Sequence, residues 1–217
     1  MSSAGQVSVK PKLRGVFHEL GFYVALGLAI PLSLTADGGR ARISAIVFST
    51  CLIACFGVSA LYHRPMWSPK IRSRLARLDH AAVYLLIAGT YTPFGLLVLS
   101  TGWAIPVLTI IWTGVIGAII LKLSWPTVPK RISAGIGIAL GWVGVVAFSQ
   151  LLKLPDIALV LVLVGGVAYT LGGIAYARQR PNPIPNVLGY HEVFHLLTLV
   201  GAGLQYAAIA FYVLPRG

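Results

Sequence analysis

The sequence predicts an all-α membrane protein: a seven-transmembrane helix bundle with its N-terminus in the cytoplasm and its C-terminus outside. The chain is 57% hydrophobic and only 10% charged, whereas a soluble domain carries about 25% charged residues. Its apolar residues gather in seven runs of about 20 residues, the length that spans a bilayer as a helix. Because one soluble core cannot bury so much apolar surface, we expect a single membrane domain.

The seven runs follow one another with short breaks between them. They lie at residues 17–34, 43–63, 79–99, 103–123, 132–152, 157–177 and 190–214. The breaks carry turn or charge signals, such as the basic stretch 64–77. The first run resembles a signal peptide, but six more runs follow, so we interpret it as an uncleaved span. We therefore expect a seven-helix domain at 17–214 after a short basic cytoplasmic segment at 1–16.

The lysines and arginines predict the orientation of the bundle. Of the 17 in the chain, 13 lie in the N-terminal segment or in the second, fourth and sixth loops. The other four are Arg40, Arg42, Lys153 and Arg216. Because positive charge marks cytoplasmic loops, the N-terminus is predicted to be cytoplasmic. The net charge of +12 is then explained by topology and by attraction to anionic head groups, and we expect no nucleic-acid partner.

Ionisable side chains gather at one end of the predicted bundle. The chain has five acidic residues and five histidines, and only Asp37 and Asp156 fall in loops on the predicted outer side. The others lie at the cytoplasmic ends of the first, second, third and seventh spans: His18, Glu19, His63, Asp79, His80, His191, Glu192 and His195. Ionisable groups in spans are costly and tend to be functional, so this gathering predicts a site.

Three histidines from distant runs are the candidate metal ligands. His191 and His195 are four residues apart and share one face of a helix, and His63 ends the second run at the same predicted depth. The pair alone is weak evidence, because packing histidines also take this spacing. Three histidines that leave a fourth position for water are the pattern of catalytic zinc sites, so we expect zinc.

Asp79 and Ser59 are the candidate catalytic residues. Asp79 opens the third run and is the acid best placed to face the histidines, although a carboxylate there could also cap the helix. Ser59 lies one turn from His63 on the same face, where it could join the site or bond to a neighbouring helix. If Asp79 binds the ion directly instead of through water, the site is closed and structural.

Four further ionisable residues lie near these candidate site residues in the predicted bundle. His80 is expected at the membrane interface, because it points about 100° away from Asp79 on a helix. His18 and Glu19 could support the site or anchor the first helix at the interface. Glu192 is expected to contact lipid head groups or arginine side chains.

The sequence resembles the hemolysin III family, part of the progestin and adipoQ receptor superfamily that includes the adiponectin receptors. The matching motifs are Ser59-x-x-x-His63, Asp79 followed by Ala88-Gly89-Thr90-Tyr91-Thr92-Pro93, and His191-x-x-x-His195. The resemblance implies zinc on His63, His191 and His195, with Asp79 touching a zinc-bound water and Ser59 beside it. It also implies a lipid-facing cavity in the bundle. The short chain resembles the bacterial members, so we expect a multi-pass protein of the bacterial inner (plasma) membrane.

The resemblance leads to three functional hypotheses. Receptor members look like lipid-amide hydrolases with ceramide as the suspected substrate, which predicts a zinc-dependent hydrolase of membrane lipid amides or esters. The alternative is a non-enzymatic sensor of membrane fluidity or lipid homeostasis with structural zinc. A cytolysin is less supported, because no separable amphipathic segment is evident. Membrane lipid is the expected partner, as substrate or sensed ligand, and the oligomeric state is not predicted.

Overall fold

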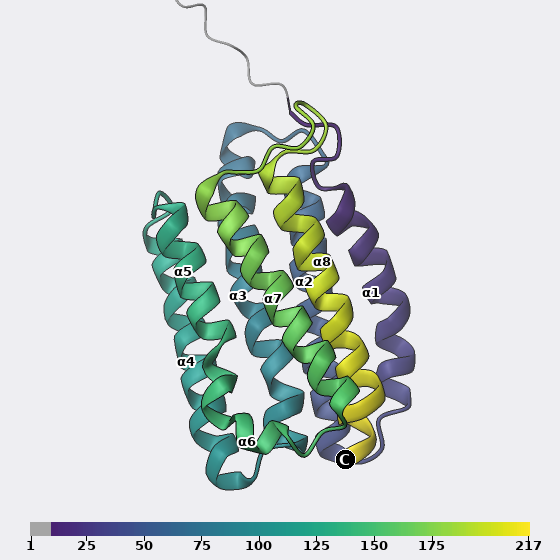
Figure 1. Ribbon diagram of the computed structural model, residues 1–217. Helices are drawn as coiled ribbons and strands as arrows, with labels where there is room; N and C mark the ends of the chain where they lie inside the picture. The colour runs from purple at the N-terminus through teal and green to yellow at the C-terminus, as the bar shows by residue number, and fades with distance from the viewer. Residues whose placement is uncertain (1–9) are drawn as a thin grey trace, which may run out of the picture.

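The computed structural model describes residues 10–217 as an all-helical bundle (Figure 1). Seven helical segments are long and apolar enough to cross a membrane, which confirms the predicted fold class. In chain order the elements are α1 Val16–Leu34, α2 Gly39–His63, α3 Pro69–Leu97, α4 Thr101–Ser124, α5 Lys130–Gly141, η1 Val143–Ala147, α6 Phe148–Leu151, α7 Asp156–Arg178, α8 Tyr190–Ala208, η2 Ile209–Val213 and η3 Leu214–Arg216.

The third span begins ten residues before the predicted boundary. Helix α3 starts at Pro69, a residue suited to the first turn of a helix. Residues 69–77 of the basic stretch that was expected as a loop form about its first two and a half turns. Lysine and arginine are good helix formers, so their charge does not end the helix. Arg72 and Arg74 are exposed on this extension, which leaves only residues 64–68 between α2 and α3.

The fifth span is interrupted near its middle. Helix α5 ends at Gly141, and the span continues through the 3₁₀ turns of η1 into the short helix α6. The Tyr91 hydroxyl of α3 donates a hydrogen bond to the Gly141 carbonyl at 2.7 Å and accepts one from the Gly144 amide at 2.7 Å. Because a bilayer offers no water to free backbone groups, this side chain satisfies the interrupted helix.

The seven spans form a ring. Each span packs against the next one in the chain, with α5 followed by α7, and α8 returns to α1. The outer face carries exposed large apolar side chains such as Ile30, Ile105 and Ile120, as expected for a surface that lipid covers.

The two termini of the described chain lie at opposite ends of the bundle (Figure 1). The segment that precedes α1 lies beside the α7–α8 loop, where Lys12 N donates to Asn186 O at 3.0 Å and Leu13 N to Val187 O at 3.2 Å. We call this end, which also holds His63 and His191, the histidine end. The assignment of this end to the cytoplasm and the domain boundary at residue 16 stay predictions.

Candidate metal centre

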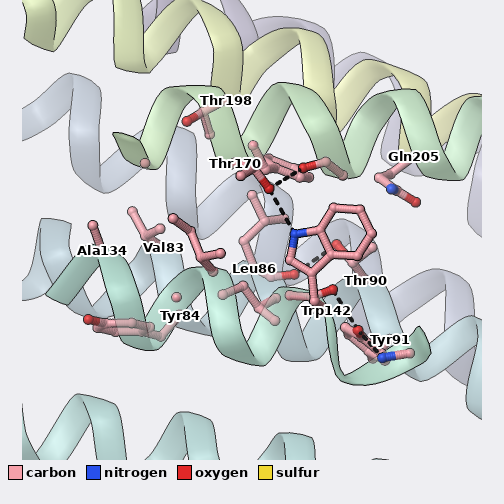
Figure 2. A pocket seen from close by; sticks show the side chains of 18 of the residues that line it. Val83, Tyr84, Leu86, Thr90, Tyr91, Ala134, Trp142, Thr170, Thr198 and Gln205 are labelled. Atoms are coloured by element: carbon pink, nitrogen blue, oxygen red, sulfur yellow. Dashed lines mark hydrogen bonds between the residues drawn. The ribbon is translucent and has the colours of Figure 1, made fainter. Parts of the chain in front are cut away.

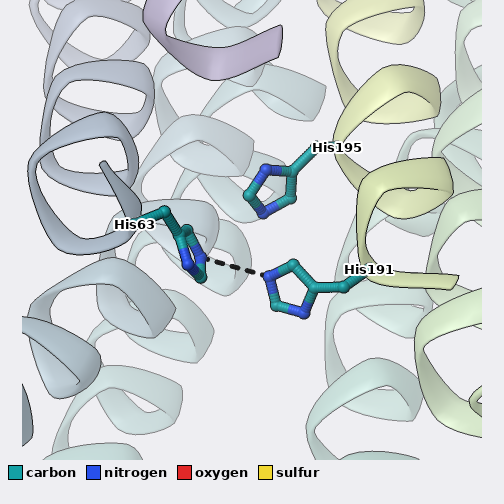
Figure 3. Close-up of side chains that lie close together, drawn as sticks. All are labelled: His63, His191 and His195. Carbon is teal, nitrogen blue, oxygen red and sulfur yellow. Dashed lines mark hydrogen bonds between the residues drawn. The ribbon is translucent and has the colours of Figure 1, made fainter. Parts of the chain in front are cut away.

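Three histidine side chains converge at the histidine end of the ring (Figure 3). His63 is the last residue of α2, and His191 and His195 lie in the first two turns of α8. One ring nitrogen from each lies within 4.8 Å of the other two, so the group could hold a metal ion. His63 and His195 are buried. The predicted convergence of distant parts of the chain is therefore confirmed.

The spacing of the nitrogens fits a metal ion. The Nε2 atoms of His63 and His191 are 3.1 Å apart. Two nitrogens held at about 2.0–2.1 Å by one tetrahedral zinc ion would be separated by about 3.3 Å. Imidazole ligands also suit copper, iron and nickel, so the donor set does not identify the metal.

Asp79 and Ser59 both lie beside the histidines and line the same cavity. Asp79 of α3 is buried, and its Oδ2 is 3.7 Å from His63 Nε2, which is beyond a direct hydrogen bond. Ser59 lies one turn before His63 on α2, and its buried hydroxyl has no hydrogen-bond partner among residues 10–217. Their placement matches the prediction, while their catalytic roles stay predictions.

The adjacent residues His18 and Glu19 on α1 belong to different surroundings. The His18 ring is 1% exposed and stacks on the His195 ring, and neither of its nitrogens has a hydrogen-bond partner within the described chain. The Glu19 carboxylate is partly exposed and pairs with Arg64 Nε at 2.7 Å. Of the two alternatives, His18 supports the site, whereas Glu19 ties α1 to the end of α2.

His80 does not face the interface, and this prediction was wrong. It is half-buried and lines the cavity, with its Nε2 3.2 Å from the Tyr176 hydroxyl of α7. Because α3 begins ten residues earlier than predicted, His80 lies well inside the helix. The cavity is also wide enough for both Asp79 and His80 to reach it.

Glu192 connects the first turn of α8 to the segment before α1. Its fully buried carboxylate pairs with Arg14 Nε and accepts a hydrogen bond from Gly189 N at 2.8 Å, so the expected arginine contact is confirmed. Gly15 follows Arg14 in the chain and has a backbone φ of +82°. A Cβ at this position would lie 2.6 Å from His63 Cβ. Glycine alone therefore allows the chain to pack so closely over His63.

A cavity of about 230 Å³ extends from the histidines into the bundle between α3, α5, α7 and α8. Figure 2 shows part of its lining, with apolar side chains such as Val83 and Leu86 and polar ones such as Thr198 and Gln205. The sequence reasoning missed these polar residues. A signal was present, since Thr198 and Gln205 follow His191 at intervals of seven residues and so share its face of α8.

The fold and the site define a seven-span membrane protein with a three-histidine cluster at one end of an apolar cavity. A family model described as "Haemolysin-III related" matches residues 7–206. The chain belongs to this haemolysin III family. Hemolysin-3 of Bacillus cereus is 32% identical over 206 residues, which cover 92% of this chain and 90% of that protein. The hemolysin-3 homolog of Bacillus subtilis (strain 168) is 27% identical over 201 residues, 91% of each chain.

Proposed function

We propose that this protein is a zinc-dependent hydrolase of an amide or ester bond in a membrane lipid. The observation that carries the proposal is the meeting of three histidines, Asp79 and Ser59 at one end of an apolar cavity. A structural metal site needs only its ligands. Here an acid and a hydroxyl that has no hydrogen-bond partner among residues 10–217 lie beside the histidines, where a substrate could reach them.

The residues divide into groups that hold a metal and groups that handle the substrate. His63, His191 and His195 would hold the ion. Zinc, when bound, supplies a Lewis acid and lowers the pKa of a bound water from 15.7 towards about 7. The Asp79 carboxylate is placed to orient a water molecule beside His63 and to accept its proton at Oδ2.

Ser59 and the cavity walls would position the lipid. The Ser59 hydroxyl has no hydrogen-bond partner among the described residues, so it is free to donate to the carbonyl oxygen of a substrate as negative charge develops there. The apolar lining beyond Ser59, including Val83, Leu86 and Phe94, suits a hydrocarbon chain. We propose that the site lies near the cytoplasmic face of a bacterial inner membrane, because of the positive charge at this end.

A non-enzymatic sensor with structural zinc is the second candidate. One observation favours it: the histidines join α2 to α8, which are separated in the ring by α1. A metal across this ring would stabilise one arrangement of the helices. Such a protein would bind lipid and lose thermal stability on chelation, but would not cleave lipid.

The test is turnover by purified protein in nanodiscs, with the metal content measured in the same sample. Fluorescent long-chain amides and esters serve as substrates, and His191→Ala is compared with His191→Cys, which keeps a zinc ligand. We expect stoichiometric zinc and turnover in the wild type, loss of both in His191→Ala, and partial retention of zinc in His191→Cys. Stoichiometric zinc without turnover of any amide or ester would contradict the hydrolase and favour the sensor.

A further inference from the structure

Gln205 lines the cavity and carries a buried hydrogen-bond acceptor that has no partner in the described part of the chain. Its side chain is 6% exposed, and its Nε2 donates a hydrogen bond to the Val162 carbonyl of α7 at 3.0 Å. Its Oε1 is buried without a partner in the described part of the chain. If the amide group of Gln205 were flipped, its Oε1 would face the carbonyl oxygen of Val162, and two acceptors would repel each other. The atom without a partner is therefore the oxygen, which accepts hydrogen bonds. Figure 2 shows the side chain at the cavity wall.

The surroundings of Gln205 hold this geometry. A Cβ on Gly165 would lie 3.0 Å from Gln205 Nε2, so glycine at this position leaves room for the amide. Tyr169, one turn away on α7, also lines the cavity, and its hydroxyl is buried without a hydrogen-bond partner among residues 10–217. A phenol hydroxyl can donate or accept. Two unused polar groups thus lie on neighbouring turns of the α7–α8 wall.

The chemistry of this region selects a neutral hydrogen-bond donor. A buried polar atom without a partner costs about 1–3 kcal/mol, so a ligand that supplies a donor gains affinity there. Phe94, Leu151 and Val162 also line the cavity, and such an apolar environment disfavours an ion. Among lipids, a hydroxyl group meets both requirements.

The position of Gln205 fixes where this hydroxyl would lie on the lipid. Gln205 is ten residues beyond His195 in the same helix, which corresponds to about 15 Å along the axis. With C–C bonds of about 1.5 Å, an extended hydrocarbon advances about 1.25 Å per carbon. A lipid whose polar end lies at the histidines would therefore reach Gln205 at about its twelfth carbon.

We propose that Gln205 and Tyr169 form a recognition site for a hydroxyl group carried midway along the hydrocarbon chain of a lipid. This inference rests on the proposed function to the extent that the polar end of the lipid lies at the histidine cluster. It does not require that the lipid be cleaved. It makes mid-chain hydroxylated lipids the preferred ligand class of the cavity.

The test compares three free acids that cannot be hydrolysed: octadecanoic, 2-hydroxyoctadecanoic and 12-hydroxyoctadecanoic acid. Each displaces radiolabelled octadecanoic acid from the purified zinc-loaded protein. We expect the 12-hydroxy acid to bind about fivefold more tightly than octadecanoic acid, as one net hydrogen bond would give, and the 2-hydroxy acid to show no such gain. Gln205→Leu should abolish the preference, measured as the ratio of the affinities for 12-hydroxyoctadecanoic and octadecanoic acid in the same variant. Gln150→Leu, on α6 and outside the cavity lining, is the matched control.

Tyr169→Phe removes a single oxygen and serves if Gln205→Leu fails to fold. It should reduce the preference for the 12-hydroxy acid.

Equal wild-type affinity for octadecanoic and 12-hydroxyoctadecanoic acid would overturn the inference and leave the proposed hydrolase unaffected. A preference that survives Gln205→Leu or Tyr169→Phe would also overturn it. Failure of all three acids to bind would remove both this inference and the support that the cavity gives to a lipid substrate. Selective binding without any lipid turnover would contradict the hydrolase alone.

Discussion

The imidazole ring of His18 lies flat against that of His195, with centroids 3.9 Å apart and planes inclined by 4°. The two rings come from α1 and α8, the helices that close the ring of spans. The Phe56 ring of α2 also packs against His18, with its centroid 4.9 Å from that of His18 and the two planes inclined by 48°. The first span therefore contacts the candidate metal centre through the ring of His18, which packs on a candidate ligand ring without belonging to the three-histidine group itself.

Removal of the His18 ring should weaken metal binding. Without the stacked ring, His195 can rotate, and we expect His18→Ala to lower zinc affinity about tenfold, as the loss of a supporting residue around a metal commonly does. His18→Phe keeps a flat ring and should retain most of the affinity. Competition with a chromogenic chelator measures both variants. A loss in His18→Phe equal to that in His18→Ala would show that the ring nitrogens, and not the stacking, matter.

Replacement of Asp79 should separate metal binding from catalysis. Asp79→Asn keeps the size of the side chain, and the carboxylate lies 3.7 Å from His63 Nε2 without a direct hydrogen bond. We expect the zinc content to stay stoichiometric while turnover falls by about 10²–10⁴, the usual contribution of a general base. Metal analysis and kinetics on one preparation check this. If zinc is lost together with turnover, Asp79 is a ligand and the site is closed.

The hydroxyl of Tyr91 should stabilise the interrupted fifth span. Tyr91→Phe leaves the Gly141 carbonyl and the Gly144 amide without this partner, and a polar group left unpaired away from water, as inside a bilayer, costs about 1–3 kcal/mol. We expect a lower melting temperature and faster hydrogen exchange at Gly144. Tyr23→Phe, on an exposed part of α1, is the matched control and should change neither quantity. Unchanged exchange at Gly144 would show that the tyrosine does not hold the break.

Alanine at Gly15 should disturb the histidine end. The left-handed backbone at φ +82° and the contact with His63 Cβ both oppose a side chain there, at a cost of about 1–3 kcal/mol for the backbone conformation alone. We expect Gly15→Ala to lower the melting temperature and to speed zinc release. Gly27→Ala, where nothing lies within 4 Å of the added Cβ, should not lower the melting temperature, because alanine favours a helix more than glycine does. Similar melting curves for the two variants would refute this prediction.

The sequence predicted the spans and the meeting of His63, His191 and His195, because apolar runs and ionisable groups in them are local signals. It did not predict that α3 starts at Pro69. The ends of the spans were predicted from charge, and basic residues that lie in a helix cannot be told from a basic loop by their charge alone. The interruption after Gly141 depends on Tyr91, which lies about fifty residues earlier in the chain. The contact of His80 with Tyr176 and the free acceptor of Gln205 depend likewise on how distant helices face one another.

The place of the ligands along the chain sets the order in which the site can be made. His191 and His195 lie in the last span, and the segment before α1 pairs with the loop that precedes that span. A nascent polypeptide that has inserted only its first six spans contains one of the three histidines. A metal ion held by all three could therefore bind only after the final span has been made, and a product that ends before this span lacks two of the three candidate ligands.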